Sequence, residues 1–239
     1  MSKVNVVCDF DGTVALQDVT DGLLERFADP SWRKVEARWL AGEFGSRECM
    51  ARQARLIDVT VEEIDRYLDS VTIDPAFPAF VDQCSSHEDV TLEINSDGID
   101  YAVRRVLDNH GFSGLQVRAN ALRAVAPTRY ELDFPHARPD CRAEAGNCKC
   151  AAARGPAATS SSPSATILIG DGASDFCVAS SADFVFAKAR LLGYCRAKGI
   201  RHMAFESFVD INRELTDVLE SLSLQGGVGH ECAEASLEL

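Results

Sequence analysis

Two acidic pairs stand out because each directly follows a short apolar run and lies beside glycine. Asp9 and Asp11 belong to the segment DFDGT, and Asp171 and Asp175 belong to the segment GDGASD. Carboxylate oxygens are the ligands that Mg²⁺ prefers, and a carboxylate held beside a cation can attack phosphorus. A site made of Asp9, the backbone carbonyl of Asp11 and Asp171 would therefore suit phosphoryl transfer, in which the protein mainly positions groups and neutralises charge.

The apolar runs before these segments are typical of buried parallel strands. They cover residues 4–10 and 166–169, and a third run, residues 90–94, ends in the polar segment NSDG. Ligands of open α/β sheets bind outside the carboxyl ends of the strands. We therefore expect Asp9, Ser96 and Asp171 to meet in one pocket, with Gly12 permitting the turn that returns Asp11 to it.

Apolar residues at helical spacing predict several helices between about residues 18 and 70 and one helix over residues 99–109. Thr60 before two glutamates is an N-cap signature for the last helix of the first group. The remaining segments with extended character are residues 115–125, 129–134, 184–186 and 202–205. Strands that alternate with helices imply a parallel sheet, so the fold class is α/β.

The domain organisation follows from where the helical insert begins and ends. We predict a core made of residues 1–15 and 77–224, with a helical cap over residues 16–76 and a hinge near Pro75 and Pro78. Residues 155–164 form a flexible loop by composition, and residues 225–239 form a flexible tail.

Composition excludes several functional classes. The apolar share is 46%, the charged share is 26% and the formal net charge is −13, which argues against a nucleic-acid surface or an anionic membrane surface as partner. A phosphate substrate would need a locally positive pocket, supplied by a metal ion and basic side chains. No apolar run reaches membrane-spanning length and the start lacks a signal peptide, so we predict a cytoplasmic protein.

The nine cysteines do not suggest a disulfide framework, because the number is odd and no secretion signal precedes them. Cys141, Cys148 and Cys150, with His136 nearby, could form a soft-metal cluster, although their spacing matches no common zinc pattern. Reduced thiols or an opportunistic disulfide are the alternatives.

The segment DFDGT, the strand-terminal Ser96, Lys149 and the segment GDGASD occur in an order that resembles the four motifs of the haloacid dehalogenase superfamily. The resemblance implies a Rossmann-like core with a parallel sheet, an inserted helical cap of the C1 type and a Mg²⁺-dependent phosphatase. It covers nearly the whole chain. Within the superfamily, the chain most resembles the phosphoserine-phosphatase-like branch, subfamily IB, and the methylthiopentenyl-phosphate phosphatases of methionine salvage.

The resemblance also implies roles for single residues. Asp9 would be the nucleophile and Asp11 the general acid and base, with Thr13 assisting locally. Lys149, for which Lys188 is the fallback, would offset charge on the nucleophile and the phosphate. Ser96, with the N–H groups of Asp97 and Gly98, would bind the phosphate. The metal would be bound by four aspartates: Asp9, Asp11, Asp171 and Asp175. Of these, Asp175 would orient a metal-bound water or Lys149.

One departure concerns Asp97, which stands where that family has a small residue beside the phosphate-binding hydroxyl. A carboxylate there could disfavour a phosphate dianion. In the cap, Asp18 and Asp21 could contact substrate, although acidic residues in the first turn of a helix are more often dipole complements. Trp32 and Trp39 are expected to pack the cap rather than to stack on a ligand.

The predicted substrate is a small phosphate ester, because a closing cap leaves little room for a macromolecule. A methylthio-keto-pentenyl phosphate comes first, followed by phosphoserine or a phospho-alcohol such as phosphocholine. The alternatives are a phosphotransferase and a phosphate-binding regulatory module without turnover. The sequence leaves the oligomeric state open.

Overall fold

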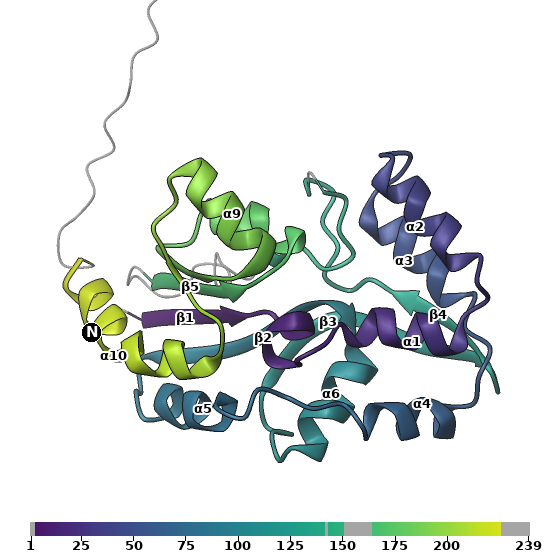
Figure 1. Ribbon diagram of the computed structural model, residues 1–239, viewed down its shortest axis with the longest axis horizontal. Coiled ribbons are helices and arrows are strands. Elements are labelled where there is room, and N and C mark those ends of the chain that lie inside the picture. The colour runs from purple at the N-terminus through teal and green to yellow at the C-terminus, as the bar shows by residue number, and fades with distance from the viewer. Residues whose placement is uncertain (1–2, 142, 151–163, 226–239) are drawn as a thin grey trace, which may run out of the picture.

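A computed structural model describes residues 3–141, 143–150 and 164–225 (Figure 1). Within these ranges the strands form one seven-stranded sheet with the order β4-β3-β2-β1-β5-β6-β7. All neighbouring strands are parallel except β3 and β4, which form an antiparallel hairpin. The strands are β1 (Lys3–Cys8), β2 (Val90–Ile99), β3 (Gln116–Ala126), β4 (Arg129–Asp133), β5 (Ser164–Gly170), β6 (Phe184–Ala187) and β7 (His202–Ala204).

The register of the central strands decides where the polar segments fall. Cys8 at the end of β1 pairs with Ile94 of β2 and with Ile169 of β5. The residues that follow these three positions therefore lie at the same level, where β1 has ended, although β2 continues along β3 to Ile99. This places the acidic and polar segments of β1, β2 and β5 side by side at the carboxyl edge of the sheet.

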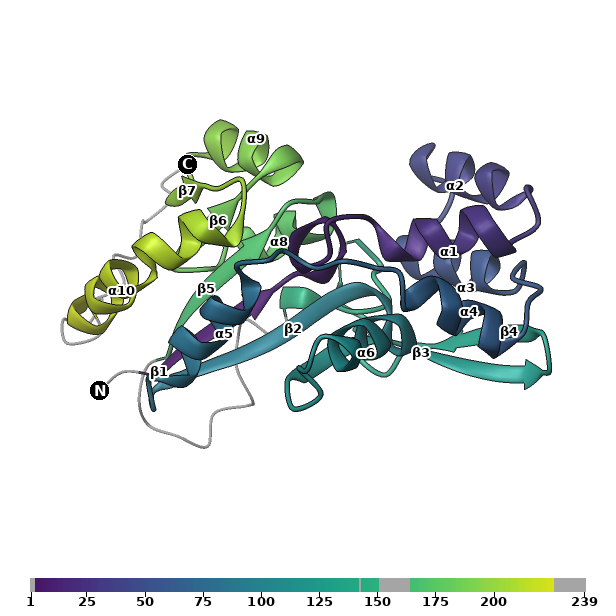
Figure 2. The same cartoon turned by 60° about the horizontal axis from the view of Figure 1, so that its bottom comes forward.

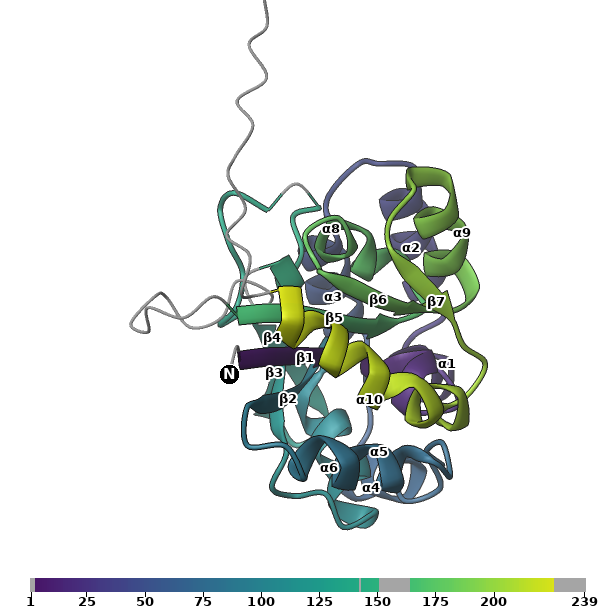
Figure 3. The ribbon, with the colours of Figure 1, turned by 90° about the vertical axis from the view of Figure 1, so that its left-hand side faces the viewer.

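Helices cover both faces of the sheet because the strand residues alternate between two apolar layers. Val4, Val6 and Cys8 of β1 belong to one buried cluster, and Val7 belongs to the other. Figures 1 and 3 show the helices that cover the sheet. On the first face these are α5 (Phe77–Ser85), α6 (Asp100–Asn109) and α10 (Phe208–Gln225), and on the second they are α8 (Phe176–Ala179) and α9 (Ala189–Lys198).

The insert lies beyond the carboxyl end of β1 and consists of α1 (Val19–Phe27), α2 (Trp32–Leu40), α3 (Ser46–Ala54) and α4 (Val61–Leu68) (Figure 2). The N-cap predicted at Thr60 is present, and the carboxylate of Glu63 accepts hydrogen bonds from the N–H and hydroxyl of Thr60. The β3–β4 hairpin extends to these helices, where the hydroxyl of Tyr130 donates to the carbonyl of Val59 at 3.0 Å. Core and insert are therefore joined along the hairpin as well as through the chain connections.

The predicted elements are present, and the extended segments over residues 115–125 and 129–134 form the hairpin. Gln225, predicted to open the tail, is instead the last residue of α10, because the apolar pattern of that helix continues through Leu222. Of the loop predicted over residues 155–164, Ser164 is instead the first residue of β5, and residues 155–163 lie outside the described residues, as does the tail over residues 226–239. The boundaries predicted for core and cap stay a prediction. No helix in the described ranges is long and apolar enough to cross a membrane.

Candidate active site

Asp9 occupies the centre of the carboxyl edge of the sheet. It follows β1, where its backbone N–H donates to the carbonyl of Ile169 and so continues the pairing with β5. Its side chain is 6% exposed and accepts a hydrogen bond from the N–H of Phe10 at 2.8 Å. Burial, with the nearby charge of Asp175, raises the pKa of Asp9 well above its ordinary value.

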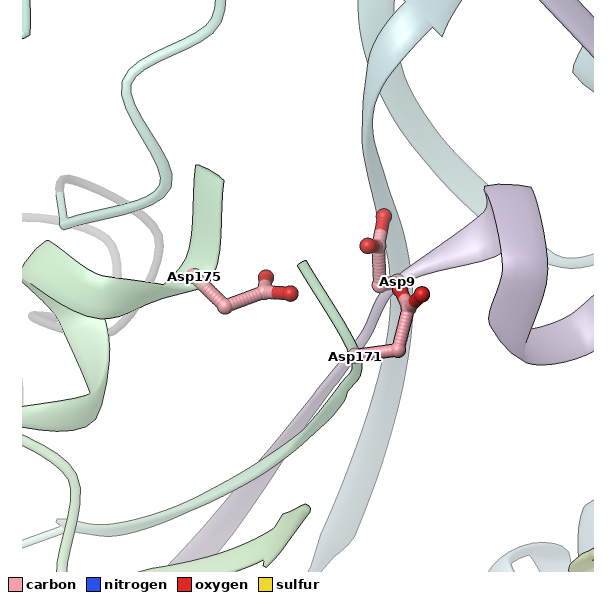
Figure 4. A group of neighbouring side chains, drawn as sticks. All are labelled: Asp9, Asp171 and Asp175. Carbon is pink, nitrogen blue, oxygen red and sulfur yellow. The ribbon is translucent and has the colours of Figure 1, made fainter. Parts of the chain in front are cut away.

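Asp171 and Asp175 complete a group of carboxylates with Asp9 (Figure 4). One oxygen from each side chain lies within 4.8 Å of the other two, and this is the one group in the described ranges whose ligand atoms could hold a metal ion. Burial and then the charge of Asp175 raise the pKa of Asp171. Converging carboxylate oxygens of this kind fit a hard divalent cation, which would offset their mutual repulsion.

Lys149 supplies the positive charge of the group. Its Nζ lies 2.8 Å from Oδ1 of Asp9, 2.8 Å from Oδ1 of Asp175 and 3.2 Å from Oγ of Ser174. Burial disfavours the charged ammonium, but Asp175 and Asp9 outweigh that effect and raise its pKa above the ordinary value. Lys188, the fallback candidate, instead lies over the ring of Phe205, 5.0 Å from its centroid.

Asp11 is held by the first turn of the insert rather than by the carboxylate group. Its Oδ1 accepts from the N–H of Val19 at 2.8 Å, and its Oδ2 accepts from the hydroxyl of Thr20 at 3.3 Å. Burial, followed by the charge of Asp18, raises the pKa of Asp11 to about 7. A carboxyl group with such a pKa can both give and take a proton near neutral pH.

The turn after Asp9 brings Asp11, Gly12 and Thr13 back toward the β5 edge. Gly12 has a φ of 68°, and a Cβ added there would lie 2.8 Å from Oδ2 of Asp171. The hydroxyl of Thr13 donates to Oδ1 of Asp171 at 3.4 Å. The absence of a side chain at Gly12 therefore permits both the turn and the close approach of Asp171.

The end of β2 places Ser96, Asp97 and Gly98 opposite these groups. The Ser96 hydroxyl accepts a hydrogen bond from the N–H of Gly98 at 2.9 Å. The Gly98 N–H, predicted to donate to phosphate, is therefore used inside the turn, whereas the Ser96 O–H is still able to donate. Asp97 accepts from the hydroxyl of Ser46 at 3.5 Å and from the N–H of Asn147 at 3.4 Å. Burial raises the pKa of Asp97, the positive charge of Lys149 lowers it by a smaller amount, and the resulting pKa is about 6.

A cavity of about 510 Å³ joins the carboxylate group to the helical insert. Its core side carries Asp9, Asp11, Ser96, Asp97 and Asp171, and its opposite side is formed by residues of α1, α2 and α3. Trp32 packs within the insert and is 4% exposed. Trp39 lines the cavity from α2, and its expected packing role stays a prediction.

The loop cysteines line a second cavity, of about 580 Å³, which Lys149 also lines. Within the described part of the chain, Cys141, Cys148, Cys150 and His136 do not form a group that could hold a metal. The Sγ atoms of Cys150 and Cys177 lie 2.6 Å apart, and both residues are free thiols. The soft-metal hypothesis therefore has no support among these residues.

Sequence reasoning missed two buried asparagines that brace the site. The Nδ2 of Asn147 donates to the Asn95 side chain at 2.8 Å and to the Ser96 carbonyl at 2.7 Å. The Nδ2 of Asn120 donates to the Asp97 carbonyl at 2.6 Å. The sequence gives little signal for either asparagine, because their partners come from strands that are distant in sequence. The one signal is that Asn147 stands two residues before Lys149.

A family model of haloacid dehalogenase-like hydrolases matches residues 6–180. The chain belongs to this family. A curated relative in Exiguobacterium sp., named 2-hydroxy-3-keto-5-methylthiopentenyl-1-phosphate phosphatase, is 33% identical over 220 residues, which cover 90% of this chain and 99% of the relative. A relative of the same name in Bacillus mycoides is 29% identical over 221 residues, covering 91% and 98%. The predicted family is confirmed, and this haloacid dehalogenase-like hydrolase is a phosphatase.

Solved structures of phosphoserine phosphatases share the fold of this haloacid dehalogenase-like hydrolase. A phospho-aspartyl intermediate analogue superposes with a TM-score of 0.61 at 16% identity, covering 92% of this chain and 99% of the other. A substrate-bound complex gives a TM-score of 0.60 at 17% identity with the same coverage. At such identities the similarity concerns the fold, and it confirms the predicted α/β class with its mainly parallel sheet.

Proposed function

We propose that this chain is a Mg²⁺-dependent phosphatase that hydrolyses a small phosphate monoester through a phospho-aspartate at Asp9. The observation that carries the proposal is the placement of Asp9. Its carboxylate lies 2.8 Å from Nζ of Lys149, within the group it forms with Asp171 and Asp175, and it lines the cavity under the insert.

Asp9 and Asp11 would carry out the bond-making and proton-transfer steps of the reaction. The carboxylate of Asp9 attacks phosphorus, forming the acyl phosphate while the ester P–O bond breaks, and Asp11 gives its proton to the departing oxygen. Water then attacks the same phosphorus, Asp11 takes the proton of that water, and phosphate leaves with Asp9 restored. A pKa of about 7 suits Asp11 to both proton transfers.

Lys149, Ser96, Thr13 and the metal ligands would manage charge during these steps. The ammonium of Lys149 favours the ionised form of Asp9, against burial and the charge of Asp175, and offsets negative charge on the transferring phosphoryl group. Mg²⁺, held by Asp9, Asp171, the carbonyl of Asp11 and an orienting Asp175, would supply further charge neutralisation. The hydroxyl of Ser96 and the N–H of Asp97 would donate to the phosphate oxygens, with Gly98 donating if its bond to Ser96 opens. Thr13 would orient Asp171.

The names of the curated relatives make a methylthio-keto-pentenyl phosphate the first candidate substrate. A cavity of about 510 Å³ suits a metabolite of that size better than a macromolecule. Transfer of the phosphoryl group to an acceptor other than water shares the first half-reaction, so it remains the alternative activity. A cytoplasmic location stays a prediction.

Phosphate release from a panel of small phosphomonoesters, with Mg²⁺ and with EDTA, tests the proposal. We expect release in Mg²⁺ that is lost in EDTA and in the Asp9→Asn variant. Asp82→Asn, an exposed change on α5, is the matched control and should keep full activity. Release that persists in Asp9→Asn would refute the phospho-aspartate mechanism, and alcohol acceptors in the assay would reveal transfer.

A further inference from the structure

The insert side of the cavity has a chemistry of its own, separate from the carboxylate group at the sheet edge. Asp21 of α1, Glu36 and Trp39 of α2 and Gln53 of α3 all line it. Glu36 and Trp39 are three residues apart, so α2 presents them on one face. The wall facing Asp9 therefore combines carboxylates, an aromatic ring and an amide.

The two carboxylates of this wall have no positive partner. Neither Asp21 nor Glu36 makes an ion pair or a side-chain hydrogen bond with any described residue, and the charge of Glu36, after burial, helps to raise the pKa of Asp21. The arginines of the same helices are engaged elsewhere. Arg26 lies over the Tyr67 ring and Arg33 pairs with Glu25.

Gln53 gives an independent indication of a ligand. It is 7% exposed, so more than nine tenths of it is buried, and it faces the cavity. Its side-chain amide has no hydrogen-bond partner among the described residues, and its polar atoms are not sealed from the cavity, so they can meet a ligand there. The ring of Trp39, unlike that of Trp32, has no cation over it in the described part of the chain. Both groups are available to a ligand.

We propose that the substrate is a phosphomonoester whose alcohol part carries an ammonium group, bound between Glu36, Trp39 and Gln53. This rests on the proposed function, because the phosphate end of the same molecule lies at Asp9, and it replaces the methylthio-keto-pentenyl phosphate, which has no ammonium group, as first candidate substrate. An ammonium group donates hydrogen bonds to the Glu36 carboxylate and the Gln53 amide oxygen and is attracted to the face of Trp39. Asp21 adds negative potential at the mouth of the site.

Two other occupants fit this wall less well. Asp21, Glu36 and the neighbouring Cys49 do not bring three ligand atoms within reach of one metal ion, since the group of Asp9, Asp171 and Asp175 is the one such arrangement in the described ranges. An alcohol part that bears a carboxylate beside its ammonium group, as in phosphoserine, would bring a like charge to Asp21 and Glu36. The basic residue lining the cavity is Arg190, on α9 of the opposite side.

Binding to the Asp9→Asn protein in Mg²⁺ tests the inference without turnover. Isothermal titration compares phosphoethanolamine with n-propyl phosphate, in which a methyl group replaces the ammonium group at nearly the same size. We expect phosphoethanolamine to bind about tenfold more tightly, as one partly buried ion pair with a cation–π contact would give. Phosphoserine should bind more weakly than phosphoethanolamine.

Variants assign this preference to the insert. Added to Asp9→Asn, Glu36→Gln should remove most of the preference for phosphoethanolamine over n-propyl phosphate. Glu48→Gln, which removes an exposed carboxylate of α3 that pairs with Arg52 outside the cavity, is the matched control and should keep the preference. Equal binding of the two esters, or a preference that survives Glu36→Gln, would overturn the inference.

Turnover by the wild-type protein separates this inference from the proposed function. Mg²⁺-dependent hydrolysis of n-propyl phosphate and phosphoethanolamine with the same kcat/KM would leave the phosphatase proposal standing and refute the ammonium site. Selective binding of phosphoethanolamine without hydrolysis of either ester would support the ammonium site and refute the proposed reaction.

Discussion

Replacing Asp97 by asparagine should stabilise the protein, because its carboxylate is half-buried beside the site and has no ion-pair partner among the described residues. Its pKa is raised from 3.8 to about 6, first by burial. The native state therefore binds more protons than the unfolded state between these values, and stability falls as pH rises through that window. At pH 8 the full rise corresponds to about 3 kcal/mol, from about 1.4 kcal/mol per unit of pKa.

We expect Asp97→Asn to raise the free energy of unfolding by about 1 to 3 kcal/mol at pH 8, because residual contact with solvent lowers the full value. At pH 5 the gain should fall to about half, since much of the native Asp97 is then protonated. Both contacts can persist with asparagine, because Oδ1 can still accept from the N–H of Asn147 and the new Nδ2 can donate to the hydroxyl oxygen of Ser46.

Urea unfolding in EDTA at pH 8 and pH 5, followed by tryptophan fluorescence, measures both values. Asp82→Asn on the exposed side of α5 is the control and should change stability by less than about 0.5 kcal/mol at either pH. A gain that is absent at pH 8, or that is as large at pH 5 as at pH 8, would refute the assignment of the burial cost to Asp97.

Four further predictions concern the site and the nearby thiols. Saturating Mg²⁺ should raise the Tm in thermal denaturation, and Asp171→Asn should lose that increase, whereas an unchanged increase would exclude Asp171 as a ligand. Lys149→Met should lower the free energy of unfolding in urea by about 3 to 5 kcal/mol, because two buried carboxylates lose their partner, and a loss below 1 kcal/mol would contradict this. Gly12→Ala should cost about 1 to 3 kcal/mol in the same assay, given its φ of 68°, and wild-type stability would argue against strain there. Hydrogen peroxide should join Cys150 to Cys177 in a disulfide, with loss of two hydrogens to form water, since their Sγ atoms lie 2.6 Å apart. Mass spectrometry should detect the product in wild type, and its presence in Cys177→Ser would contradict this pairing.

The fold was predictable because strand and helix periods are local properties of the chain. The β-branched runs that became β1, β2 and β5 each end at a polar or glycine-containing segment, and parallel pairing then brings those segments to one edge. The hairpin of β3 and β4 was harder to predict, because much of it is half-exposed and rich in alanine. Its contact with the insert depends on pairs such as Tyr130 and Val59, which no local pattern joins.

The candidate site divides in the same way. Asp9, Asp11, Asp171 and Asp175 carry a signal in their spacing and their neighbouring glycines. Asn147 has little signal beyond its place two residues before Lys149, because its partners come from β2 and β3, which are distant in sequence.

The sequence by itself determined the α/β class, the order of the motifs and the acidic residues at the strand ends, because these depend on neighbours along the chain. Tertiary structure alone decided that Lys149 rather than Lys188 contacts Asp9, and that Glu36 and Gln53 face the same cavity. Each of these contacts joins segments that the sheet order and helix packing bring together. Their geometry is fixed only when the whole chain has folded.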